Sequence, residues 1–134
     1  MRRFWTTGLL SVSLILPTTA VAKVKPDREV TRAMNEVLDI YAECIMENAQ
    51  TLEPSGEAAP VVADAAVAAC RTVRVKAQEV IMLHAMVNSG VSVEIAGNVA
   101  DQMLAKIDNA GREKAALSIT KIRAEAKAGA KPPN

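Results

Sequence analysis

The sequence predicts an all-α fold: a small antiparallel helical bundle of three to four helices with one disulfide. Apolar residues recur at spacings of three and four through most of the chain, which is the period of an α-helix face. The alternation of apolar and polar residues that is typical of strands is absent. Two cysteines fall on the apolar faces, in a chain whose N-terminus predicts export to an oxidising compartment.

The first 22 residues read as a signal peptide. Two arginines precede an apolar stretch, residues 4–16, that is short for a membrane-spanning helix. Ala20 and Ala22 then give the small-residue pattern that signal peptidase accepts, so the mature chain is expected to begin at Lys23. An uncleaved anchor, or a first helix of the fold, is the alternative. The expected location is the periplasm or the exterior of the cell.

Cleavage would leave a chain suited to one helical domain over residues 23–128. Tyr41 would be its only aromatic residue, so the core must consist of aliphatic side chains. Its net charge would be about −1, and it offers no aromatic platform for bases, so no nucleic-acid partner is expected. Residues 129–134 contain Pro132 and Pro133, cannot continue a helix, and are expected to form a disordered tail.

The first helix is predicted to start at Asp27, whose carboxylate can accept hydrogen bonds from free backbone N–H groups. Turn residues at positions 53–57 interrupt the helical pattern. One face of this helix carries residues spaced by three and four: Val30, Met34, Val37, Tyr41 and Cys44.

A second helix is expected to follow, with Pro60 in its first turn and a stop at Asn88-Ser89-Gly90. Its many alanines permit close approach of the first helix in an antiparallel hairpin. The expected buried face is a series at spacings of three and four: Ala63, Ala66, Cys70, Val73, Ala77, Val80, His84 and Val87.

The last helical segment contains a change of face. Ser92 can cap a helix that carries Ala96, Ala100, Met103 and Ile107 on one side. The same register then reaches Lys114 and Lys121, whereas the apolar residues lie on a shifted face: Ala115, Ile119, Ile122 and Ala126. The shift falls at residues 109–111, where either the chain turns into a fourth helix or one long helix takes a stutter. We favour the turn.

Cys44 and Cys70 are predicted to form a structural disulfide between the first two helices. Cys44 lies ten residues before Pro54 and Cys70 ten residues after Pro60, so both should lie about 15 Å from the bend of the hairpin. A redox-active pair or a zinc site is the alternative, but the chain has no Cys-x-x-Cys and only one histidine.

Met82, His84 and Met86 suggest a copper site, since thioether and imidazole groups bind cuprous ion. The two methionines are one helical turn apart, whereas His84 points to nearly the opposite side. The three side chains cannot converge locally, so we expect no metal and no cofactor. His84 is expected to have a hydrogen-bond partner on the helix seam.

An acidic stripe runs along the first helix, formed by Glu36, Asp39, Glu43 and Glu47. We expect it to pair within the fold with basic side chains: Arg71, Arg74, Lys76, Arg112, Lys114, Lys121, Arg123, Lys127 and Lys131. A basic partner or a divalent cation is the alternative. The basic C-terminal segment lacks the Trp or Phe of interfacial helices, so no stable membrane insertion is expected after signal cleavage.

The order of Tyr-x-x-Cys, a Ser-Gly-Glu turn and an alanine-rich helix with a second cysteine resembles small exported bacterial proteins, a resemblance that implies no activity. The sequence favours a non-enzymatic interaction module that binds another protein or a component of the cell envelope. The first alternative is a small-ligand or metal-binding bundle around His84. The second is a hydrolytic enzyme, which would need a nucleophile such as Ser89, Ser92 or Thr120 near His84.

Overall fold

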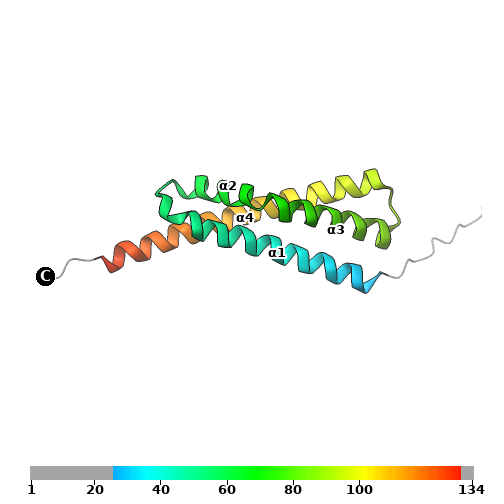
Figure 1. Ribbon diagram of the computed structural model, residues 1–134, viewed down its shortest axis with the longest axis horizontal. Helices are drawn as coiled ribbons and strands as arrows, with labels where there is room; N and C mark the ends of the chain where they lie inside the picture. Colours follow the sequence, from blue (N-terminus) through cyan, green and yellow to red (C-terminus); the bar gives the residue numbers. More distant parts are fainter. Residues whose placement is uncertain (1–25, 131–134) are drawn as a thin grey trace, which may run out of the picture.

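The computed structural model describes residues 26–130, and every regular element in that range is a helix (Figure 1). The elements are α1 (Arg28–Leu52), the 3₁₀ turn η1 (Glu53–Ser55), α2 (Ala59–Ala69), α3 (Arg71–Ser89) and α4 (Val93–Gly129). The predicted all-α bundle with one disulfide is confirmed. The predicted signal peptide, the expected N-terminus at Lys23 and residues 131–134 lie outside the described residues.

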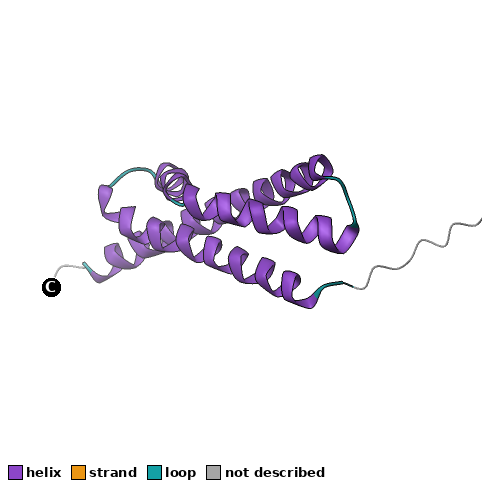
Figure 2. Ribbon diagram, turned by 45° about the vertical axis from the view of Figure 1, so that its right-hand side comes forward, coloured by secondary structure: helices purple, strands orange, loops and turns teal. Residues whose placement is uncertain are grey.

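The four α-helices form three rods, in which each rod runs antiparallel to the next, so that α1 and α4 are parallel. α1 is the first rod, α2 and α3 run one after the other as the second, and α4 is the third (Figure 1). The loop between α1 and α2 and the loop between α3 and α4 lie at opposite ends of the bundle (Figure 2). Each rod packs against the other two, so one core of aliphatic side chains runs along the bundle.

The start of α1 is tied to the end of α3. The Asp27 carboxylate accepts from the backbone N–H groups of Glu29 and Val30, at 2.9 and 3.2 Å, and so caps the helix as expected. The backbone N–H of Asp27 donates to Oδ1 of Asn88 at 2.6 Å, and Nδ2 of Asn88 donates to Thr31 at 3.2 Å. One asparagine therefore joins two helix ends that are 61 residues apart in sequence.

Arg123 of α4 holds the turn between α1 and α2. Its Nε donates to Oε1 of Glu53 at 3.0 Å, and its two Nη groups donate to the carbonyls of Glu53 and Glu57 at 3.0 and 2.6 Å. Gly56 completes the turn with φ of 77°, a left-handed conformation that favours glycine. The turn is thus fixed by the third rod as well as by its own sequence.

The second rod is broken at Cys70, which corrects the expectation of one continuous helix. The last turn of α2 closes with a 3₁₀-type hydrogen bond, in which the N–H of Cys70 donates to the carbonyl of Val67 three residues before it, and Cys70 takes ψ of 16°. This tighter turn changes the face that α3 buries. The residues of α3 that are buried are Ala77, Ile81 and Ala85, whereas the expected Val73, Val80 and His84 are half-buried and Val87 is exposed.

α4 is one uninterrupted helix of 37 residues, so the favoured turn at residues 109–111 is wrong. Its buried face continues through the region of the apparent shift: Ala96, Ala100, Leu104, Asp108, Ala115 and Ile119. Gly111 fills the gap in this series and packs against α1, where a Cβ atom on Gly111 would lie 2.8 Å from Cδ1 of Ile45. The glycine permits close approach of two helices and does not make a turn.

At about 1.5 Å per residue α4 is about 55 Å long. Within residues 26–130, neither α4 nor any other helix has the apolar stretch needed to cross a bilayer.

Candidate functional site

The disulfide joins the C-terminal half of α1 to the break between α2 and α3. Cys44 and Cys70 are bonded, with their Cα atoms 6.0 Å apart. Nδ2 of Asn48 donates to the carbonyl of Cys44 at 2.9 Å and lies 3.4 Å from the sulfur of Cys70. The expected pairing at one level of the hairpin is what the structure contains, although Cys70 lies between two helices and not within one.

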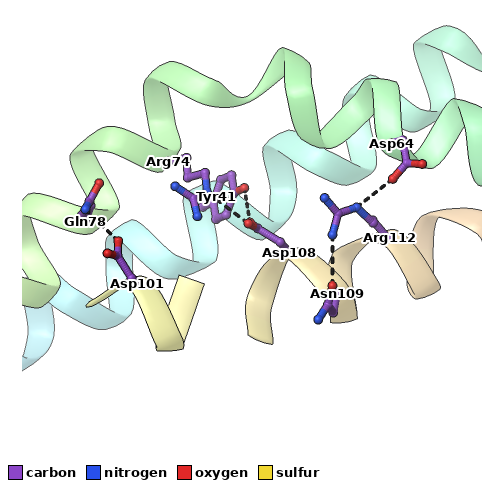
Figure 3. A network of polar contacts seen from close by, with 8 residues as sticks. All are labelled: Tyr41, Asp64, Arg74, Gln78, Asp101, Asp108, Asn109 and Arg112. Atoms are coloured by element: carbon purple, nitrogen blue, oxygen red, sulfur yellow. Dashed lines mark hydrogen bonds and ion pairs between the residues drawn. The ribbon is translucent and has the colours of Figure 1, made fainter. Parts of the chain in front are cut away.

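A buried polar cluster connects the three rods near the same level (Figure 3). The hydroxyl of Tyr41 in α1 donates to Oδ1 of Asp108 in α4 at 2.6 Å. Nε of Arg74 in α3 donates to Oδ2 of the same carboxylate at 3.1 Å. Tyr41 is fully buried and Asp108 is 8% exposed. Both oxygens of the carboxylate therefore have a partner, and each partner comes from a different rod.

The pKa of Tyr41 is raised well above its ordinary value. Burial is the largest cause, since it disfavours the phenolate, and the hydrogen bond to Asp108 and the charge of that carboxylate add to it. Tyr41 is therefore a neutral donor at physiological pH. The phenol of Tyr41 is inaccessible to solvent and donates its hydrogen to Asp108, so the cluster links the three rods through hydrogen bonds.

Asp108 was not predicted from the sequence to be part of a site. The signal that could have found it is the four-residue spacing of Ala96, Ala100 and Leu104, which leads directly to Asp108 and then to Ala115 by way of Gly111. A charged residue in phase with a buried alanine face indicates a buried partner for that charge.

Three polar contacts flank this cluster (Figure 3). Nε of Arg112 lies 2.8 Å from Oδ1 of Asp64 in an ion pair whose angle is not that of a hydrogen bond, and its Nη1 donates to Asn109 at 3.0 Å. Nε2 of Gln78 donates to Asp101 at 2.9 Å. These contacts join α4 to α2 and to α3, and they occupy Arg112.

The acidic stripe, defined as Glu36, Asp39, Glu43 and Glu47, is exposed along α1. The ion pairs among residues 26–130 are Arg74–Asp108, Arg112–Asp64, Lys121–Glu125 and Arg123–Glu53, and none includes a residue of the stripe. The expected pairing of the stripe within the fold is therefore not found in this part of the chain. Three of the arginines that were expected to pair with the stripe pair with other carboxylates.

A groove of about 450 Å³ lies beside the stripe, between α1 and α4. Its lining is mostly apolar, with charged groups at its edges: Leu38, Asp39, Ala42, Glu43, Ile45, Met46, Ile107, Ala110, Gly111 and Lys114. The close contact of Gly111 with Ile45 brings the two backbones together and forms the floor. Asp39 and Glu43 come from the α1 bank, and Lys114 comes from the α4 bank. We call this feature the α1–α4 groove.

Met82, His84 and Met86, which the sequence raised as a copper site, all lie on α3. Met82, His84 and Met86 are half-buried, and Met82 contacts the region of Gly97 in α4. No hydrogen bond of His84 is present within residues 26–130, so the expected partner is not found there. No group of three or more His, Cys, Asp or Glu side chains in the same range could hold a metal ion.

Comparison of the chain with protein-family models, with curated proteins and with solved structures finds no match.

Proposed function

We propose that this chain is a non-enzymatic exported protein that binds another protein through the α1–α4 groove. The observation that carries the proposal is the combination of an apolar floor with charged edges in one surface depression. Apolar area supplies most of the free energy of association, and polar groups at its margin select the partner. A bundle held by a disulfide and a buried polar cluster is a rigid frame for such a surface.

An exposed apolar side chain beside the groove supports the same proposal. Leu117 of α4 is 64% exposed. Leu117 follows Ala110 and Lys114 at spacings of four and three, so it continues the α4 edge of the groove by one turn. Apolar residues that extend a groove add contact area for a bound partner.

Export is part of the proposal and rests on two features. Ala20 and Ala22 provide the cleavage pattern, and the disulfide is a bond that persists in oxidising compartments. The partner would then be a protein of the cell envelope or the exterior.

Site-specific photo-crosslinking in cells that export the full chain tests the proposal. A crosslinking residue in place of the exposed Ala42, on the α1 bank, should give a covalent adduct with one discrete protein. The same residue in place of the exposed Thr72 of α3 is the control and should not give that adduct. Ala110→Trp fills the groove from the α4 bank and should remove the adduct of the Ala42 position. The same adduct from both positions, or none from Ala42, would refute the proposed function.

A further inference from the structure

Building on the proposed function, we infer that the occupant of the α1–α4 groove is a cationic amphipathic helix of a partner protein. Its apolar ridge lies on the groove floor, and one flank of lysine or arginine side chains faces the acidic stripe of α1. The inference adds the chemistry of the partner, and three features of the groove carry it.

The first feature is the length of the groove. Its α1 bank runs from Leu38 to Met46 and its α4 bank from Ile107 to Lys114, so each bank is about 11–12 Å long at 1.5 Å per residue. This length matches two turns of a helix, whose apolar residues at i, i+3, i+4 and i+7 would lie between the banks. Both banks carry small residues, which allow a third helix to approach closely: Ala42, Ala110 and Gly111.

The second feature is the charge of the α1 bank. Glu36, Asp39, Glu43 and Glu47 are spaced by three, four and four residues and span about 16 Å. All four are exposed, and none takes part in the ion pairs within residues 26–130. Lysines at the same helical spacings on an occupant would meet them one by one.

The third feature is the opposite charge of the α4 bank. Lys114 is the one charged residue that α4 contributes to the groove lining. Since α1 supplies carboxylates and α4 an ammonium group, the groove distinguishes the two flanks of an occupant. A helix with cations on one flank only has a preferred orientation, because its reverse would bring cations towards Lys114.

A synthetic peptide of about 18 residues, about 27 Å long as a helix, is the probe. Leucine and alanine form its apolar ridge, lysines occupy one flank, and glutamine fills the other positions. A matched peptide carries glutamate in place of every lysine, and a third has the composition of the first in scrambled order. Fluorescence anisotropy of the labelled peptides against the purified mature protein, with its disulfide intact, measures the affinities.

The lysine peptide should bind at about 0.05 M salt and weaken as salt is raised, and the glutamate and scrambled peptides should not bind. Glu43→Gln should weaken binding about 2–5-fold, and Asp39→Asn with Glu43→Gln about 10-fold, since exposed ion pairs contribute roughly 0.2–1 kcal/mol each. Glu79→Gln removes an exposed carboxylate of α3 and should leave the affinity unchanged. Ala110→Trp should abolish binding while the circular dichroism spectrum stays that of the parent.

Equal binding of the lysine and glutamate peptides, or an affinity unchanged by Asp39→Asn with Glu43→Gln, would overturn the inference. If no peptide binds and the Ala42 crosslink in cells still depends on an open groove, the proposed function stands and the cationic helix is wrong. If that adduct contains only two copies of this chain, the occupant is a second copy, and the inference is again overturned. If the peptide binds as expected but no crosslink forms in cells, the charge preference is real and the proposed function fails.

Discussion

Replacing Gly111 by alanine changes the free energy of unfolding in two opposite ways, through helix preference and through packing. In a helix interior alanine is favoured over glycine by about 1 kcal/mol. The new Cβ, however, would lie 2.8 Å from Cδ1 of Ile45, which is fully buried. Overpacking of this kind costs about 1–3 kcal/mol. With a packing cost of about 2 kcal/mol, Gly111→Ala should lower the free energy of unfolding by about 1 kcal/mol.

Ile45→Val separates the two energies, because it removes the one atom that the new Cβ would clash with. The next atoms of Ile45 lie 3.5 and 3.9 Å from that Cβ position, at ordinary contact distances. Ile45→Val alone should lower the free energy of unfolding by about 1 kcal/mol. In the Ile45→Val background Gly111→Ala should become stabilising by about 1 kcal/mol, since only the helix preference remains. The coupling energy of the pair is then about 2 kcal/mol.

Urea unfolding of the parent, both single variants and the double variant measures this cycle, with the disulfide intact in all four and equal m-values as the check on two-state behaviour. Thr120→Ala, at an exposed position of α4, is a control for general effects of alanine on this helix. The reasoning fails if Gly111→Ala stabilises the parent, or if its effect is the same with isoleucine and with valine at position 45.

Five further predictions concern the disulfide, Tyr41, Arg123 and the signal peptide. Cys44→Ser with Cys70→Ser should lower the free energy of unfolding by about 3 kcal/mol in urea, as expected for a link across 26 residues; a loss below about 1 kcal/mol would show that the link contributes little. Tyr41 is the sole tyrosine, so the phenolate absorbance reports it alone; the native protein should show no ionisation at the ordinary tyrosine pKa, near 10, and a normal titration would contradict the buried cluster. Because the folded state holds this proton more tightly, stability should fall as pH rises above about 10, and Tyr41→Phe should lose that part of the slope. Arg123→Ala should lower the free energy of unfolding by about 1–2 kcal/mol. Arg123→Lys should restore little of that loss, because an ammonium group cannot reach all three acceptors. Lys121→Ala is the control and should have almost no effect, because it breaks only an exposed ion pair. N-terminal sequencing of the exported protein should find Lys23 first, and recovery of the intact Met1 form in the membrane would overturn the cleavage site.

The helical hairpin and its disulfide could be predicted from the sequence because both depend on local spacing. Asp27 caps α1, the residues before Pro60 make the turn, and Tyr41 is buried on the expected face. In sequence, Cys44 lies ten residues before Pro54 and Cys70 ten residues after Pro60, and a bend fixes which positions of two helices lie opposite each other. The spacing of apolar residues and the number of residues between a cysteine and a turn can both be counted in a single sequence.

The break at Cys70 and the continuity of α4 could not be predicted in the same way, since both depend on tertiary contacts. Nothing in the sequence around Cys70 opposes a helix, and the change of face becomes visible only where α3 buries Ile81. At Gly111 the sequence suggested a helix end, but the helix continues through this residue. A glycine is typical of a helix end, but close approach to Ile45 gives Gly111 another role.

The groove and the acidic stripe show a different limit of sequence reasoning. The stripe itself follows from spacing on one helix, and its four members are exposed as expected of charged residues. Its neighbours could not be known without the packing of α1 on α4, which places Lys114 and Ala110 beside Asp39 and Glu43. The pairing of Arg74, Arg112 and Arg123 with other carboxylates likewise depends on positions in three rods.

The position of the disulfide has a consequence for amide hydrogen exchange. The bond is attached at the break in the second rod, where α2 ends and α3 begins, and it leads to the C-terminal half of α1. A break between two helices is where one of them could open while the other stays folded, and the link to α1 opposes such separate opening. We therefore expect the amides around Cys70 to exchange only with the whole bundle, and to become faster than those of the α4 core once the bond is reduced. The last turns of α4 beyond Arg123, which are exposed on all sides, should exchange fastest among the described helices in either state.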